Sequence, residues 1–106
     1  QIHGTLDPTV KFDGDSTLNM EPIDNVLNYW STYNSCDPTP AHSVIDYPDF
    51  SIDYIKYNNC LNSVNVELYK ISNMGHTWPS KNNYGISATE EVWNFVSQFD
   101  IYGKID

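Results

Sequence analysis

Alternating apolar and polar residues mark a β-strand most clearly over residues 64–71, where apolar side chains recur at every second position. Residues 50–58 are rich in β-branched and aromatic side chains, although their alternation is imperfect. Because the two segments are separated by a short polar stretch, they predict a hairpin of residues 50–58 and 64–72. Cys60 is expected near the turn of this hairpin.

Two other segments repeat apolar residues at the three- and four-residue spacing of an amphipathic helix. The first begins near Glu21 and Pro22, a residue suited to the first helical turn, and extends to about Tyr33. The second follows the capping-box sequence Ser87-Ala88-Thr89-Glu90, and we expect it to pack on one side of the sheet. The apolar positions of the two helices are Ile23, Val26, Leu27 and Trp30, and then Val92, Trp93, Phe95, Val96 and Phe99.

The remaining segments carry turn and loop signals. Residues 37–49 contain three prolines and are expected to form an irregular surface excursion. Residues 80–85 are polar and end in glycine, which predicts a mobile loop beside the end of the second hairpin strand. Residues 100–106 are interpreted as a tail or the start of a linker. The mixture of strands and helices predicts one α/β unit over residues 1–99.

Composition and charge narrow the possible partners. The 106 residues carry a formal net charge of −9. A nucleic-acid partner is not expected, because binding phosphates requires a basic surface, and an anionic membrane is disfavoured for the same reason. No apolar run approaches the length of a membrane-spanning helix. Aromatic residues make up 14% of the chain and could line a groove for a polymer or an aromatic ester, although ordinary packing is the commoner role of any one ring.

The two cysteines, Cys36 and Cys60, both lie in polar, loop-like surroundings. A free thiol is more usually buried among apolar residues, so this placement favours a disulfide in an oxidising compartment. Two separate reduced thiols are the alternative. Neither cysteine has a basic neighbour that would lower its pKa, so cysteine catalysis is not expected.

An acid and a histidine each follow a predicted strand end. Asp7 lies in the turn after residues 1–4, and His76 lies a few residues beyond the strand of residues 64–71. Loops held by a rigid scaffold often carry functional residues, and these two are the types that orient and accept a proton in a charge-relay set. The alternative for any single histidine is a surface or packing role.

The other histidines and a neighbouring glycine have simpler interpretations. His3 is expected to be structural, and His42 is expected to be exposed in the proline-containing segment. A zinc site made from the three histidines matches no local ligand motif, so neither a metal nor another cofactor is expected. Gly75 is expected to let the loop turn sharply before His76.

Two motifs near the ends of the chain resemble the C-terminal part of the polyhydroxybutyrate depolymerase and feruloyl esterase group. One is Gly4-Thr5-x-Asp7-Pro8-x-Val10, and the other is Gly75-His76-Thr77-Trp78-Pro79. Their combination in this order is fairly specific, whereas either motif alone is weak. The resemblance covers nearly the whole chain and also includes Trp30, Asn34, Cys36, Tyr57, Cys60, the strand to Ile71 and residues 88–95.

The resemblance implies a secreted α/β-hydrolase serine esterase, of which this chain would form the last sheet strands, a hairpin and two packing helices. It matches Asp7 to the catalytic acid and His76 to the catalytic base, and it also implies a bridge between Cys36 and Cys60. In α/β-hydrolases the nucleophilic serine lies in Gly-x-Ser-x-Gly and precedes the acid and the base. This sequence contains no such motif. We therefore expect the serine in an upstream part of the same catalytic domain, and we expect the chain alone to be inactive.

Two functions from different classes follow from the sequence. The first is hydrolysis of a carboxylic ester, such as a polyester, acetyl or feruloyl ester bond, with Asp7 and His76 in catalytic roles. In that case Trp78 would either form a wall of the substrate cleft or pack under the histidine loop. The second is a non-catalytic fragment or an aromatic-rich, polymer-binding module, which the missing nucleophile motivates.

Overall fold

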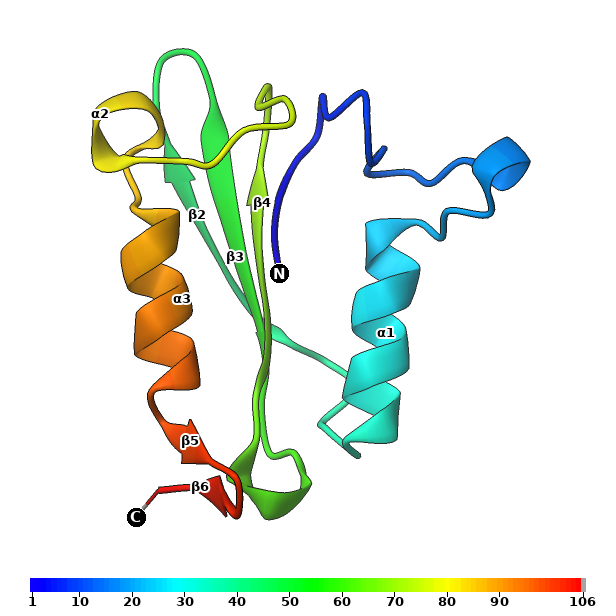
Figure 1. Cartoon of the computed structure of the whole chain (residues 1–106), viewed down its shortest axis with the longest axis vertical. Helices are drawn as coiled ribbons and strands as arrows, with labels where there is room; N and C mark the ends of the chain where they lie inside the picture. The colour runs from blue at the N-terminus through cyan, green and yellow to red at the C-terminus, as the bar shows by residue number, and fades with distance from the viewer. Residues whose placement is uncertain (106) are drawn as a thin grey trace.

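The computed structural model describes residues 1–105, and its centre is a mixed sheet of four strands in the order β1-β4-β3-β2. The strands are β1 (Ile2–Gly4), β2 (Ala41–Asp46), β3 (Ser51–Tyr57) and β4 (Val66–Ile71). β1 pairs parallel with β4, whereas β3 pairs antiparallel with β4 on one side and with β2 on the other. Figure 1 shows this sheet between α1 on one side and α2 and α3 on the other.

The predicted hairpin is confirmed as β3 and β4, which pair antiparallel in a register that places Tyr54 opposite Tyr69. The connection between these strands contains the short 3₁₀ helix η2 (Leu61–Ser63), directly after Cys60. The side chains of β4 alternate as the sequence predicts. Val66 and Leu68 belong to the apolar cluster on one face, and Ile71 belongs to the cluster on the other.

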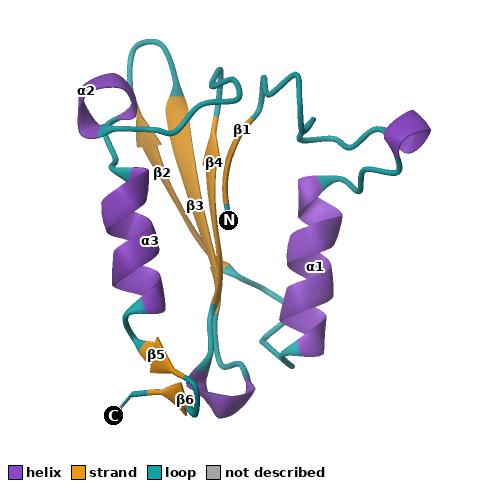
Figure 2. Cartoon of the chain, viewed as in Figure 1, coloured by secondary structure: helices purple, strands orange, loops and turns teal. Residues whose placement is uncertain are grey.

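The expectation of an irregular excursion over residues 37–49 is wrong, because β2 occupies the middle of this segment. Pro38 and Pro40 precede the strand and Pro48 follows it, so the residues that lack an N–H lie outside the hydrogen-bonded pairing with β3. β2 is an edge strand, a position in which neighbouring prolines are tolerated and both faces can be exposed. Figure 2 shows β2 beside β3, with which it pairs antiparallel.

The two predicted helices are confirmed as α1 (Ile23–Tyr33) and α3 (Ala88–Val96). The capping interaction is also present, since the Ser87 hydroxyl accepts a hydrogen bond from the Glu90 N–H. The expectation of a mobile loop over residues 80–85 is wrong, because the segment contains the helical turn α2 (Lys81–Tyr84). Polar residues that resembled a loop act here as caps, with the Asn83 side chain accepting from the Ser80 N–H at 2.7 Å.

Two apolar clusters stabilise the sheet, one on each face. The cluster under α1 combines residues of the helix, of β4 and of the loop after β1, and its buried members are Phe12, Ile23, Leu27, Val66 and Leu68. The cluster on the opposite face consists of Ile52, Ile71 and Met74, against which Tyr84 and Ile86 pack. α3 contributes little to this second cluster. Its Ala88 is fully buried, whereas Val92 and Val96 remain 41% and 47% exposed.

The end of the chain forms a small two-stranded sheet from β5 (Phe99–Asp100) and β6 (Gly103–Lys104). This hairpin includes most of the segment interpreted as a tail or linker, so that segment has regular structure up to Lys104. The Ile105 N–H donates to the Gln98 carbonyl at 2.8 Å and closes the hairpin. Asp106, the last residue of the segment, lies outside the described residues.

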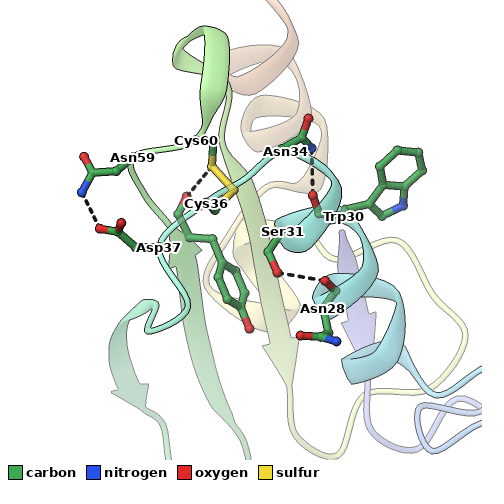
Figure 3. Close-up of a disulfide and its surroundings, with 9 residues drawn as sticks. Asn28, Trp30, Ser31, Asn34, Cys36, Asp37, Asn59 and Cys60 are labelled. Carbon is green, nitrogen blue, oxygen red and sulfur yellow. Dashed lines mark hydrogen bonds between the residues drawn. A yellow bond between two sulfur atoms is a disulfide. The ribbon is translucent and has the colours of Figure 1, made fainter.

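The predicted disulfide joins Cys36 to Cys60 (Figure 3). It connects the end of α1 to the β3–β4 connection, at the end of the sheet opposite the β4 C-terminus. The Cys36 N–H donates to the Ser31 carbonyl, and the Asp37 N–H donates to the Asn58 carbonyl, each at 2.9 Å. The bridge therefore lies between two hydrogen-bonded segments. Over residues 1–105, no helix is both long and apolar enough to cross a membrane.

Candidate functional site

The parallel pairing of β1 and β4 brings Asp7 and His76 together. Because parallel strands end at the same edge of a sheet, the loops that follow β1 and β4 emerge side by side. Asp7 lies three residues after β1, and His76 lies five residues after β4. Their side chains meet in a hydrogen bond of 2.8 Å between His76 Nδ1 and Asp7 Oδ2, across 69 residues of sequence. The structure thus joins the two residues that the sequence singled out.

Asp7 is held in place by its own turn. The side chain is buried, with the residue only 7% exposed. Its Oδ1 atom accepts hydrogen bonds from the backbone N–H groups of Thr9 and Val10, both at 2.8 Å. This is the local hydrogen bonding that makes aspartate common in turns. With Oδ1 occupied by the backbone, Oδ2 is the oxygen that faces His76.

The surroundings of Asp7 favour its ionised form. Burial alone raises the pKa of this carboxyl and is the largest single influence on it. The hydrogen bonds from the Val10 N–H, from His76 and from the Thr9 N–H outweigh burial together, and they leave the pKa below the ordinary value of 3.8. At neutral pH Asp7 is therefore a carboxylate that can only accept hydrogen bonds.

The protonation of His76 follows from this partner. A carboxylate accepts at both oxygens, so the proton in the His76–Asp7 hydrogen bond resides on Nδ1. In a neutral imidazole the lone pair then lies on Nε2. The His76 side chain is 59% exposed, so a group outside the described chain can reach Nε2. Among residues 1–105, the bond to Asp7 is the one side-chain hydrogen bond that His76 makes.

Gly4 lets the two loops lie against each other. The Thr5 N–H donates to the Ile71 carbonyl at 3.0 Å, and the Leu6 N–H donates to the Met74 carbonyl at 2.9 Å. A Cβ atom on Gly4 would lie 2.1 Å from that Met74 carbonyl oxygen, well inside contact distance. The absence of a side chain at the end of β1 is therefore what allows this close approach.

The expectation that position 75 requires a glycine is wrong. A Cβ atom on Gly75 would come no nearer than 4.0 Å to its closest neighbour, the Leu6 carbonyl oxygen, and the φ angle of Gly75 lies outside the left-handed region. The requirement for glycine applies instead to Gly4, which in the sequence is marked only as part of a motif. Its position at a strand end directly before a turn was the available signal.

A cavity of about 350 Å³ opens beside this pair of loops. Trp78 lines it together with His76, and the indole N–H donates to the Thr89 hydroxyl of α3 at 3.0 Å. The residue is 63% exposed, so its ring borders the cavity and is not packed beneath the histidine loop. The other lining residues are Ile2, His3, Gly4, Asp7, Met74, Gly75 and Thr77.

The remaining histidines occupy different environments. His3 is buried, 7% exposed, and lies beside Asp7. His42 lies on β2 with its side chain 52% exposed, as expected, and pairs with Asp53 of β3. In the part of the chain that the structure describes, no group of three or more histidine, cysteine or acidic side chains could hold a metal ion.

A second, larger cavity of about 590 Å³ lies between α1 and α3 at the outer edge of β1, and no pattern in the sequence predicts it. Within residues 1–105, β1 is the terminal strand of the sheet, and this edge pairs with no other strand. The apolar side chains lining the groove include Ile2, Val26, Trp30, Val92, Phe95 and Val96. The two helices therefore present apolar surface on both sides of an unpaired strand.

Two tyrosines that line this groove form hydrogen bonds with glutamates that also line it. The Tyr69 hydroxyl donates to Glu91 Oε2 at 2.8 Å, and the Tyr54 hydroxyl donates to Glu67. Burial, followed by the hydrogen bond and charge of the neighbouring glutamate, raises the pKa of each tyrosine well above its usual range. Both tyrosines stay neutral at physiological pH and continue to donate to their glutamates.

Comparisons of the chain with protein-family models, with curated proteins and with solved structures found no match.

Proposed function

We propose that this chain supplies the acid and the base of a serine-type carboxylic ester hydrolase, with the nucleophilic serine in an upstream part of the same domain. The observation that carries the proposal is the 2.8 Å hydrogen bond between Asp7 and His76 Nδ1, which leaves His76 Nε2 as an accessible base. A buried, ionised aspartate behind an exposed imidazole is the arrangement that Ser-His-Asp catalysis requires.

In the proposed reaction, His76 Nε2 takes the proton of the serine hydroxyl as its oxygen bonds to the ester carbonyl carbon. The Asp7 carboxylate stabilises the imidazolium that forms and fixes the orientation of the ring. His76 then gives the proton to the alkoxide as the ester C–O bond breaks. A water molecule, deprotonated by the same nitrogen, then attacks the acyl carbon of the acyl-enzyme. The bond from this carbon to the serine oxygen breaks, His76 returns the proton to the serine oxygen, and the acid is released. Trp78 would provide an apolar wall for the acyl or alcohol group.

The groove at the outer edge of β1 supports the proposal that an upstream segment of the same domain packs against this chain. The Tyr69 N–H donates to the Gln1 carbonyl, and the Thr5 N–H donates to the Ile71 carbonyl, so the odd-numbered residues of this segment face β4. By alternation, the N–H and C=O of Ile2 point to the unpaired edge. Another strand added there would extend the sheet, and its side chains would cover the apolar groove between α1 and α3.

The disulfide between Cys36 and Cys60 is compatible with an extracellular protein. We propose secretion on this ground, with an ester or polyester outside the cell as the substrate class.

The proposal is tested with His76→Ala in the full polypeptide that carries the serine, assayed with a soluble aryl ester. We expect kcat to fall by about 10⁴-fold or more, because the serine loses its general base. His42→Ala is the matched control, since it removes the histidine of an exposed His–Asp pair, and it should retain wild-type kcat. A His76→Ala enzyme with most of its activity would refute the assignment.

One observation favours the alternative, a polymer-binding surface. Tyr29, Trp30 and Tyr33 pack against one another on α1 with ring centroids 5.2–6.2 Å apart, and each residue is at least 48% exposed. In this case the isolated chain should be retained on insoluble polyester or polysaccharide, and Tyr33→Ala should reduce retention severalfold. The absence of any retention would exclude the binding function for this surface.

A further inference from the structure

His3 is the one histidine of the described chain that is buried, and it lies behind the proposed acid. Its Nε2 atom lies 2.6 Å from the Val10 carbonyl oxygen and 3.6 Å from Asp7 Oδ2. The first distance is a hydrogen bond, and the second is too long to be one. On its other side, His3 Nδ1 lies 3.0 Å from the Gln1 side-chain amide.

These partners fix the tautomer of His3. A backbone carbonyl can only accept, so the proton in the bond to Val10 resides on His3 Nε2. His3 Nδ1 then carries the lone pair and accepts from the Gln1 amide. The two histidines on either side of Asp7 therefore hold their protons on opposite ring nitrogens, Nε2 in His3 and Nδ1 in His76.

The hydrogen bond from His3 closes a ring of contacts around the turn that follows β1. Val10 is held at both ends, since its N–H donates to Asp7 Oδ1 at 2.8 Å and its carbonyl accepts from His3. His3 itself is part of β1, whose pairing with β4 is fixed by the sheet. The Asp7 turn is thereby tied to the strand at its beginning and, through Val10, near its end.

We propose that His3 is a positioning residue for Asp7: by holding the Val10 carbonyl it keeps Oδ1 on the backbone N–H groups and Oδ2 on His76 Nδ1. Without this bond, the turn over residues 7–10 loses its attachment to the strand, and the Asp7 carboxylate can rotate away from the imidazole. His3 does not touch the reacting atoms. Its consequence for catalysis rests on the proposed function, whereas its effect on the Asp7–His76 bond does not.

The test measures the tautomer of His76 in the 106-residue chain from the ¹⁵N chemical shifts of its ring nitrogens, at a pH where the ring is neutral. His3→Phe keeps an aromatic ring but removes the donor to Val10. His3→Gln places an amide N–H near the position of Nε2 and should restore the donor. Phe12→Leu is the control for packing, because the Phe12 ring contacts that of His3, with centroids 6.0 Å apart, and makes none of these hydrogen bonds.

We expect wild type, His3→Gln and Phe12→Leu to show His76 as the Nδ1–H tautomer. In His3→Phe the Nδ1–H fraction should fall at least twofold. A His3→Phe chain that is folded by near-UV circular dichroism and retains the wild-type His76 shifts would overturn the proposal. If His3→Phe does not fold, His3→Asn replaces it, because its shorter amide cannot reach Val10. If both variants fail to fold while Phe12→Leu folds, His3 is a general folding residue, and the positioning role is overturned.

Activity separates this inference from the proposed function. In the full polypeptide, His3→Phe should lower kcat about tenfold with KM unchanged, and His3→Gln should restore it. If His76→Ala leaves esterase activity intact, the proposed function fails, but the tautomer measurement still decides the role of His3.

Discussion

The chain contains two histidine–aspartate pairs whose environments differ sharply. In the first, His76 Nδ1 lies 2.8 Å from Asp7 Oδ2, and the aspartate side chain is only 6% exposed. In the second, His42 Nε2 lies 3.2 Å from Asp53 Oδ1, with side chains 52% and 29% exposed. The first pair joins two loops at the end of the sheet, whereas the second crosses two neighbouring strands, β2 and β3, on the surface.

The difference shows that a histidine–aspartate contact becomes a candidate catalytic unit through its surroundings. Two backbone N–H groups hold Asp7, and a cavity opens beside His76. Asp53 lies on a sheet face where water screens its interaction with His42. Cross-strand pairs of this exposed kind contribute at most about 1 kcal/mol to stability.

The largest expected effect comes from replacing the aspartate of each histidine–aspartate pair. Asp7→Asn in the full polypeptide should lower kcat by about 10⁴-fold, because an asparagine amide favours the wrong tautomer of His76. Asp53→Asn should change kcat by less than about twofold, since surface substitutions of this kind have small effects. Steady-state kinetics with a soluble ester measures both. Equal losses in the two variants would mean that the environments do not distinguish the pairs.

A smaller effect is expected from replacing Gly4, the glycine at the end of β1 that precedes the Asp7 turn. Gly4→Ala should reduce the free energy of unfolding by about 3 kcal/mol, because its Cβ would overlap the Met74 carbonyl. Gly75→Ala should stay within about 0.5 kcal/mol of wild type, since the added methyl group has room. Urea unfolding of both variants measures the difference. A stable Gly4→Ala chain would show that the loops can separate without loss.

The smallest effect concerns acid pH. The pKa of Asp7 in the folded chain lies below its ordinary value of 3.8, so its contribution to stability is complete above that value. The contribution is lost as the pH falls from 3.8 through the lower, folded-state pKa. Asp7→Asn should therefore reduce the slope of the unfolding free energy against pH in this acid range. The reduction should correspond to at most about one proton.

Asp15 would obscure this measurement, because a hydrogen bond from Thr17 and then one from Lys11 lower its pKa to about 2. The comparison is therefore made between Asp15→Asn and the double variant with Asp7→Asn, by urea titration between pH 2 and pH 6. Parallel pH dependences in the two chains would contradict a lowered Asp7 pKa.

The local pattern of apolar and polar residues was sufficient to predict some helices and strands but not others. The periodicity of residues 23–33 and 64–71 predicted α1 and β4 because each places its apolar side chains on a packed face. β2 was missed because prolines flank it and every one of its residues is exposed, so no apolar alternation marked it. The α2 turn was missed because its capping residues resemble those of a loop.

The identity of the candidate site residues could be predicted from the sequence, but their arrangement in space could not. The motifs around Asp7 and His76 singled out both side chains, yet their contact depends on the parallel pairing of β1 with β4, which no local pattern encodes. The need for glycine at position 4, and not at position 75, depends on where the Met74 carbonyl lies after the loops meet. The supporting contact from His3 depends on the path of the turn back to Val10.

The disulfide also has a consequence for the order in which the chain folds. Asp7 and His76 are 69 residues apart, and joining them requires closing one of the longest loops in the chain. The Cys36–Cys60 bridge bypasses a separation of 24 residues within that loop, which lowers the entropic cost of closure by roughly 0.4 kcal/mol. We expect contacts at such separation to form after the β3–β4 hairpin and the helices, because loop-closure entropy opposes non-local contacts more than local ones. The proposed catalytic pair would therefore assemble among the last contacts, and slightly faster once the cysteines are oxidised.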